Sequence, residues 1–232
     1  MLRLVDLSLD IYDKAPTFWP DPKTAVMPHL KIENLNYNIT QLVMSTHLGT
    51  HLDAPYHFFD DGLTVENLDV RRGFGPALVL DFTHKARKDE ITVEDLEAYG
   101  DKIGKGSRLI FHTGWDKVFP NPDYFGEQPV LGIETCKWMA QKGVICVALD
   151  TPTTYPSEYL ATHHALLNKQ AEILIIEGLR GLERLQSKEV ILIALPLRIA
   201  GRDGAPCRAM AIDGDIEPLK PLFEQLAFSL AD

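Results

Sequence analysis

Cysteine is scarce in this sequence, and the three residues present form no known framework. Cys136, Cys146 and Cys207 are odd in number, widely spaced and without a CxxC pair. This pattern excludes a disulfide scaffold and favours reduced thiols, which are typical of a cytoplasmic protein. Cys146 lies in an apolar run, where a cysteine usually serves as inert core.

The sequence also lacks long apolar runs and an excess of positive charge. No run approaches the length of a membrane span, and residues 1–13 carry aspartates where a secretion signal would be apolar. The net charge is −10, whereas nucleic acids and anionic membranes favour proteins with clustered Lys and Arg. We therefore expect no nucleic-acid partner, no membrane attachment and a cytoplasmic location.

Linkers, internal repeats and low-complexity tracts are absent too. The chain has 232 residues, 45% of them hydrophobic, which is enough for one sizeable core. Strands interspersed with helices indicate the α/β class, and we expect a single domain over residues 1–232. Prolines between residues 16 and 28 predict an irregular passage there. The pattern predicts strands at 77–82, 107–111, 144–149 and 190–194, and a helix at 133–142.

Two common catalytic motifs are missing. The sequence has no GxSxG, which argues against a serine hydrolase, and no HExxH, which argues against a helical zinc protease. It has instead THLGTHLDAPYHF at residues 46–58, with three histidines and one aspartate between positions 47 and 57. Imidazole and carboxylate together are ligands for zinc, manganese or iron, so this stretch predicts a divalent-metal site.

His47, His51 and Asp53 match the three protein ligands of a catalytic metal site, which leaves a position open for water. Gly49 and Pro55 argue against a helix, and in an extended chain these odd-numbered ligands point to one face. Residues four apart on a straight strand are separated by about 13 Å, near the limit for sharing one ion. We therefore predict a bend at Gly49, where the missing side chain lets the backbone turn. The alternative is a strand end whose polar side chains face solvent or form hydrogen bonds within the core.

The motif HLGTHLDAPYHF resembles the HxGTHxDxPxHF signature of the cyclase-like metal-dependent hydrolases. That family includes bacterial kynurenine formamidase and isatin hydrolase. The resemblance implies a swivelling β/β/α fold with a mixed sheet, assembled as homodimers or higher oligomers. It also implies that His47, His51 and Asp53 hold one ion and that Asp53 bridges to a second.

A later segment resembles the part of the family that completes the second metal site. It consists of ATHHALL at residues 161–167, expected to be helical, and an apolar strand at 173–176 that closes on Glu177. The resemblance assigns His163 and Glu177 as ligands. Because the interval between them is longer here than in the family, His164 stays an alternative to His163, and Glu172 to Glu177.

His57 and Trp19 are candidates for catalysis and substrate binding. His57 lies beyond Pro55, past the expected ligands, and is placed to pass a proton to a leaving nitrogen. Trp19 lies beside Phe18 in the proline-rich passage. This aromatic pair either covers an edge of the core or, as the resemblance implies for Trp19, contacts a planar aryl group of the substrate.

These features indicate an enzyme that hydrolyses a small-molecule amide or formamide with metal-activated water. The resemblance favours one or two zinc ions, with manganese as the alternative metal. It favours N-formyl-L-kynurenine as the substrate, which would yield kynurenine and formate in tryptophan catabolism. A cyclic amide of the isatin type is the alternative substrate, and a metal-dependent binding protein without turnover is the alternative from another class.

Overall fold

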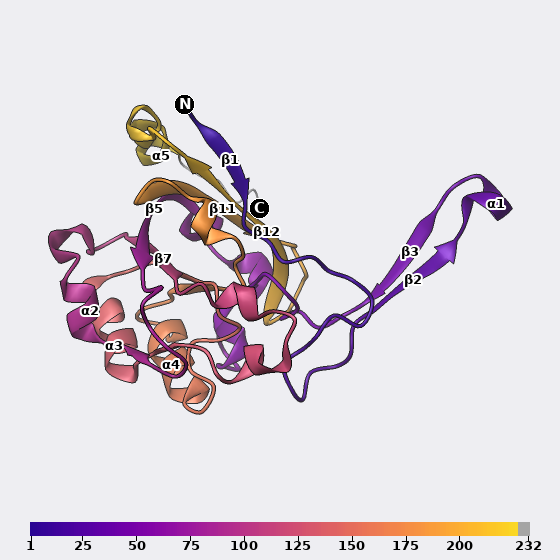
Figure 1. Cartoon of the computed structure of the whole chain (residues 1–232), viewed down its shortest axis with the longest axis horizontal. Coiled ribbons are helices and arrows are strands. Elements are labelled where there is room, and N and C mark those ends of the chain that lie inside the picture. Colours follow the sequence, from indigo (N-terminus) through magenta and orange to yellow (C-terminus); the bar gives the residue numbers. More distant parts are fainter. Residues whose placement is uncertain (227–232) are drawn as a thin grey trace.

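The computed structural model describes residues 1–226, and a mixed sheet of eight strands forms its centre (Figure 1). Strands β5, β7, β9 and β10 run parallel, and the other pairings are antiparallel. Strand β4 pairs with both β10 and β12, so the sheet closes on itself at this point. The predicted α/β class and mixed sheet are confirmed. In spatial order the strands are β1 (Arg3–Asp6), β12 (Gly204–Asp213), β11 (Glu189–Pro196), β5 (Phe74–Asp81), β7 (Arg108–His112), β9 (Cys146–Leu149), β10 (Leu174–Glu177) and β4 (His51–Asp53).

The parallel strands are buried on both faces, which explains their nearly continuous apolar sequences. One face is covered by the helices drawn together at the lower left of Figure 1, where Leu96, Met139 and Leu166 pack against Leu80 and Phe111. The opposite face carries a second apolar cluster that spans the curved part of the sheet. The covering helices are α2 (Val93–Glu97), α3 (Ile133–Lys142) and α4 (Tyr159–Leu167).

Local sequence signals fix where these helices begin and end. Thr92 accepts a hydrogen bond from the Asp95 backbone N–H, and the Asp95 carboxylate accepts one from the Thr92 N–H, which forms a capping box at the start of α2. Helix α3 ends at Gly143, whose φ of 75° is accessible to glycine at little steric cost. The predicted helix at 133–142 is thus confirmed with its C-terminal cap.

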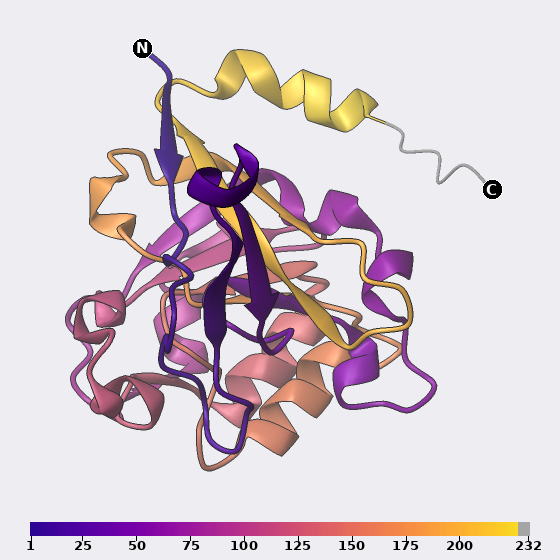
Figure 2. The same ribbon diagram turned by 90° about the vertical axis from the view of Figure 1, so that its right-hand side faces the viewer.

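A long arm projects from the body and contains a separate two-stranded sheet (Figures 1 and 2). The arm consists of β2 (Ala25–Leu30), α1 (Ile32–Leu35) and β3 (Ile39–Val43). The expectation of an irregular passage up to residue 28 was wrong at its end, because Pro28 lies within β2 opposite Thr40. Each strand of a two-stranded sheet has a free edge, and proline is tolerated there because its missing N–H is not needed.

The remaining elements are short. Strands β6 (Glu90–Ile91) and β8 (Val130–Leu131) form a small parallel pair, and α5 (Lys220–Gln225) lies next to β5. Single 3₁₀ turns occupy Pro55–His57, Val65–Asn67, Val70–Gly73, Gly100–Lys102, Trp115–Val118, Pro122–Phe125, Leu182–Arg184 and Glu217–Leu219. Within residues 1–226, no helix has the length and apolar character needed to cross a bilayer.

Candidate metal centre

The histidine motif folds as a turn followed by a short strand. Gly49 has a φ of 65°, so the chain bends where the sequence predicted, and the ring centroids of His47 and His51 lie 5.0 Å apart. Strand β4 then holds His51 and Asp53, which share a face because they are two residues apart. The turn Pro55–His57 follows and brings His57 back, so that its ring stacks on His47 with centroids 3.9 Å apart.

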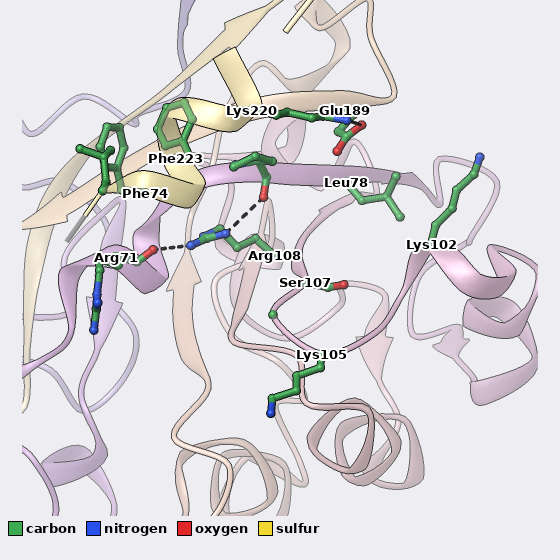
Figure 3. Close-up of a pocket in the computed structure, with 13 residues that line it drawn as sticks. Arg71, Phe74, Leu78, Lys102, Lys105, Ser107, Arg108, Glu189, Lys220 and Phe223 are labelled. Carbon is green, nitrogen blue, oxygen red and sulfur yellow. Dashed lines mark hydrogen bonds and ion pairs between the residues drawn. The ribbon is translucent and has the colours of Figure 1, made fainter. Parts of the chain in front are cut away.

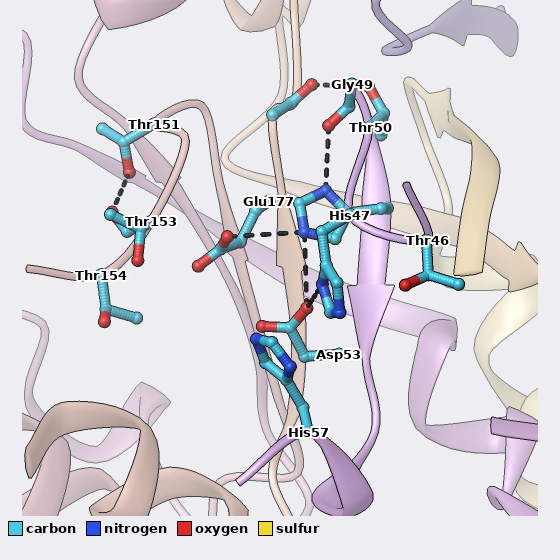
Figure 4. Close-up of polar contacts among 12 residues, drawn as sticks. Thr46, His47, Gly49, Thr50, Asp53, His57, Thr151, Thr153, Thr154 and Glu177 are labelled. Atoms are coloured by element: carbon cyan, nitrogen blue, oxygen red, sulfur yellow. Dashed lines mark hydrogen bonds and ion pairs between the residues drawn. The ribbon is translucent and has the colours of Figure 1, made fainter. Parts of the chain in front are cut away.

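The second segment meets the motif across the sheet. Strands β4 and β10 are antiparallel with Glu177 opposite His51, and the His51 Nε2 lies 3.6 Å from the Glu177 Oε2. Helix α4 supplies His163, whose Nε2 is 3.5 Å from the Asp53 Oδ2 and 3.6 Å from the Glu177 Oε1. Figure 4 shows His47, Asp53, His57 and Glu177 converging on one point between the two strands.

Two groups of side chains within residues 1–226 have the spacing of metal ligands. One is His51, Asp53 and Glu177, the other is His47, Asp53 and His57, and in each group the ligand atoms lie within 4.8 Å of one another. The His51 Nε2 and the Glu177 Oε1 are buried and have no hydrogen-bond partner among the described residues. A buried polar atom without a partner is destabilising, and a cation between these two atoms would satisfy both. The residues present therefore fit a divalent metal.

The histidines of the site are packed between carboxylates, and this arrangement shifts their pKa values. Burial lowers the pKa of His47, but Asp53 and Asp203 outweigh it and raise this pKa to about 10. Burial likewise opposes protonation of His163, while Asp53 and Glu177 raise its pKa to about 10. Burial and the neighbouring Asp53 raise the pKa of Glu177. The buried carboxylates thus require positive charge beside them, which either protons or metal ions supply.

His57 differs from the other histidines. Burial lowers its pKa to about 4, although its side chain is still 30% exposed. The ring therefore stays neutral at pH 7, with a nitrogen lone pair available to accept a proton. This neutral nitrogen is partly exposed beside the metal-ligand cluster, where it can accept a proton from a group bound in the pocket.

Asp203 is a member of the site that sequence reasoning did not identify. Its Oδ2 lies 2.7 Å from the His47 Nε2 and accepts a hydrogen bond from the Thr46 hydroxyl at 3.1 Å. Its backbone carbonyl accepts from the Ala54 N–H at 2.8 Å, which ties the loop to the motif. The next residue is Gly204, where an added Cβ would lie 2.8 Å from the His47 Cε1. Only an Asp-Gly pair in a glycine-rich loop marked this position in the sequence.

The structure separates the alternatives left open for the later segment. His163 is buried and faces Asp53, whereas His164 is exposed and its ring lies against Phe59 with centroids 4.9 Å apart. Glu172 lies away from the cluster and pairs with Arg72 at 3.5 Å. Geometry therefore places His163 and Glu177 in the site.

A pocket of about 230 Å³ opens onto the cluster, and aromatic side chains form much of its wall. Trp19 does not line it and is 86% exposed. Phe18 lines the pocket instead, and it begins a turn in which the Asp21 N–H donates to the Phe18 carbonyl at 2.8 Å. Within this chain, the aromatic contact expected of Trp19 is therefore made by its neighbour Phe18. The aromatic lining residues are Phe18, Phe58, Phe119, Tyr124, Phe125 and Tyr159.

A second cavity of about 510 Å³ lies apart from the cluster, next to α5 (Figure 3). Its most buried cation, Arg108, donates to the carbonyl oxygens of Arg71 and Arg72 at 2.5 and 2.9 Å and so braces the backbone. Lys102 and Lys105 extend away from Arg108 in different directions. The polar groups of this cavity do not converge, in contrast to those of the histidine pocket.

Solved structures share this fold. A protein described as a potential metal-dependent hydrolase with cyclase activity is 27% identical, with a TM-score of 0.75 over 93% of this chain and 100% of that chain. A predicted metal-dependent hydrolase from Bacillus stearothermophilus is 28% identical, with a TM-score of 0.77 over 92% of this chain and 100% of that chain. The fold and the histidine–carboxylate cluster define the class as metal-dependent hydrolases.

Sequence comparison gives the family. The Cyclase family model matches residues 5–155. Kynurenine formamidase from Bacillus cytotoxicus is 33% identical over 89% of this chain and 95% of its own length. Kynurenine formamidase from Erythrobacter litoralis is 34% identical over 75% of this chain and 76% of its own length. The chain belongs to the Cyclase family.

Metal binding is expected to release protons. The pKa values of His47 and His163 are raised to about 10, so at neutral pH the metal-free rings hold protons that an ion must displace. We expect the apparent zinc affinity to increase as pH rises from about 6 to about 8, with net proton release near pH 7. Titration calorimetry in buffers of different ionisation enthalpy measures both quantities, and an affinity independent of pH would contradict the assignment.

Asp203→Asn is expected to weaken metal binding about 10- to 100-fold, because a carboxylate on the far nitrogen of a ligating histidine fixes the ring and raises its basicity. The affinity is measured by competition with a chromogenic chelator. The matched control is Asp101→Asn, since Asp101 is exposed and lies in a turn outside the site. Equal metal affinities for Asp203→Asn and Asp101→Asn would show that Asp203 does not contribute to metal binding.

Proposed function

We propose that this enzyme hydrolyses the formamide bond of N-formyl-L-kynurenine and releases kynurenine and formate, a step of tryptophan catabolism. The observation that carries the proposal is an aromatic-lined pocket that ends on buried histidines and carboxylates. Kynurenine formamidases that are about one-third identical over most of the chain support the choice of substrate.

The metal ligands are assigned as follows. His47, His51 and Asp53 hold one ion, and Asp53 bridges to a second ion completed by His163 and Glu177. Asp53 suits the bridging role because it belongs to both groups of close ligand atoms, although those groups place His51 with Glu177 and His47 with His57. Its carboxylate is buried next to His47, His51 and His163. Zinc is the proposed metal and manganese the alternative, because the ligand set suits both. When bound, such an ion lowers the pKa of water toward neutrality and polarises a carbonyl.

His57 is the proposed proton carrier. Its neutral ring accepts a proton from the attacking water and then delivers it to the leaving nitrogen. Delivery is needed because an amine leaves poorly as an anion. The ring is held for this task by the stacked His47 and by an edge-to-face contact with Phe58, whose centroid lies 4.5 Å away.

The pocket wall suits a flat aryl group. Phe18 and Phe125 pack edge to face with centroids 6.3 Å apart and leave aromatic surface on which a substrate ring can pack. A formamide attached to that ring would extend toward the histidines at the end of the pocket. The pocket volume of about 230 Å³ suits a small-molecule amide.

We propose that the enzyme acts in the cytoplasm as a single-domain homodimer or higher homo-oligomer.

A cyclic amide of the isatin type is the second candidate. An isatin hydrolase bound to the product analogue thioisatinate has the same fold, with a TM-score of 0.80 over 91% of this chain and 92% of that chain at 24% identity. Isatin is also a planar aryl compound with an amide carbonyl. The same aromatic pocket would therefore accommodate it.

The deciding experiment is a substrate panel with the metal-loaded and the chelator-treated enzyme. We expect formate and kynurenine from N-formylkynurenine, loss of turnover after chelation, and recovery with zinc or manganese. Turnover of isatin without turnover of N-formylkynurenine would favour the second candidate. Full metal occupancy without hydrolysis of any formamide, lactam or lactone would indicate a binding protein instead.

His57→Ala and Asp53→Ala are expected to separate catalysis from metal binding. His57→Ala should keep its metal and lose about 10²- to 10⁴-fold in kcat, which is the usual range for general acid–base catalysis. Asp53→Ala should lose the metal itself, because it removes a ligand of both sites. Metal content by atomic emission and kcat measured on the same samples test both statements. A His57 variant with wild-type kcat, or an Asp53 variant with full metal, would contradict them.

A further inference from the structure

The wall of the histidine pocket carries very little charge away from the metal ligands. It is built mainly from aromatic rings, prolines and threonines, and none of its lining residues within residues 1–226 is Lys or Arg. Glu177 lines the pocket as an assigned metal ligand, which leaves Asp21 as the one other acidic residue of the wall in this range. A bound molecule therefore meets one carboxylate outside the metal centre and no ammonium or guanidinium group.

Two sets of hydrogen bonds hold Asp21 in the wall. Its backbone N–H donates to the carbonyl of Phe18, which also lines the pocket, at 2.8 Å. Its Oδ2 accepts from the Ser45 hydroxyl at 3.2 Å, and the Ser45 Oγ accepts from the His47 backbone N–H at 3.1 Å. The carboxylate is thus connected to the histidine motif through a single side chain, and its position relative to the metal ligands is fixed.

The Asp21 carboxylate still has capacity to bind a cation. Within the described part of the chain it forms no ion pair, and its Oδ1 accepts no hydrogen bond. In contrast, Asp10 pairs with Arg180 and Asp203 pairs with His47. Asp21 is half-buried. Because such a carboxylate is partly shielded from water, an ammonium group that reaches its free oxygen interacts more strongly than it would with a fully exposed one.

The proposed substrate contains a group that matches this carboxylate. N-formylkynurenine is an aryl formamide whose ortho side chain ends in an α-ammonium and a carboxylate, whereas isatin has neither group. With the formamide at the histidines and the ring between aromatic side chains, the ortho side chain lies against the rest of the wall. Its ammonium group can pair with Asp21 there. Its carboxylate meets no basic side chain among the lining residues within residues 1–226 and stays toward solvent.

We propose that Asp21 determines substrate specificity by binding the alkylammonium group of the substrate. The enzyme then selects aryl formamides that carry a cationic side chain over those with a neutral or an anionic one. Asp21 contacts the substrate away from the bond that breaks, so it contributes to binding and not to the chemical step. The inference rests on the proposed function, because the formamide at the histidines sets where the side chain lies.

The test is calorimetric binding of three aminophenyl ketones to the zinc-loaded protein. Kynuramine carries an alkylammonium side chain, ortho-aminoacetophenone carries none, and in the third compound a carboxylate replaces the ammonium of kynuramine. We expect the wild type to bind kynuramine about tenfold more tightly than ortho-aminoacetophenone and to bind the carboxylate compound most weakly. The preference for kynuramine is expected to fall as salt rises from about 50 to about 500 mM. Asp21→Asn is expected to abolish this preference without changing the affinity for ortho-aminoacetophenone.

The matched control is Asp13→Asn, which makes the same change of charge in the same loop. Asp13 is exposed, accepts from the Val26 N–H at 3.0 Å and does not line the pocket, so this variant is expected to keep the preference for kynuramine.

Two results would overturn the proposal. One is a wild type that does not prefer kynuramine, which decides the matter even if the Asp21 variant does not fold. The other is an Asp21→Asn variant that binds all three compounds equally less tightly than the wild type, because Asp21 would then only support the loop through Ser45. Binding is measured without turnover, and hydrolysis of the corresponding formamides is measured separately. Failure of the proposed function and failure of this inference are therefore distinguishable.

Discussion

The close burial of two carboxylates, Asp53 and Glu177, is the constraint on which the site depends. Their residues are 1% and 4% exposed, and each carboxylate lies within 4 Å of the His163 ring. Two negative charges held together away from water are strongly destabilising unless positive charge is placed beside them. The surrounding histidines supply that charge when they are protonated, and a metal ion bound by the same histidines and carboxylates would supply it instead. Folding and metal binding are therefore coupled.

The closure of the sheet provides this arrangement. Strand β4 is only three residues long, yet it pairs with β10 on one side and β12 on the other. The first pairing sets Glu177 opposite His51, and the second sets Gly204 opposite Asp53. Gly204 leaves room for the His47 ring, and the carboxylate of the preceding Asp203 forms a hydrogen bond with that ring. Strand β4 thus brings together segments that are far apart in the sequence, because β10 and β12 both pair with it.

The part of the site that lies between residues 47 and 57 could be predicted from the sequence because these residues are local, whereas His163 and Glu177 were assigned through the family resemblance. The spacing of the histidines, the bend at Gly49 and the α/β pattern all follow from short-range rules of backbone geometry. Asp203 could not be predicted in this way, since its contact with His47 depends on the pairing of β12 with β4. The choice of Phe18 over Trp19 as the pocket residue depends on a turn geometry that a proline-rich sequence does not specify. The first strand of the arm was missed because the prolines up to Pro28 were interpreted as an irregular passage, whereas Pro28 lies within β2.

The most direct test of the two-ion site is anomalous diffraction from crystals of the zinc-loaded protein, recorded at the zinc absorption edge. We expect two peaks that share Asp53, one bonded to His47 and His51 and the other to His163 and Glu177, at the usual distances of about 2.0–2.2 Å. A single peak bonded to His47, His51 and Asp53 would preserve the first site and reject the bridge. Zinc bound elsewhere, with these side chains unliganded in an active enzyme, would contradict the central claim.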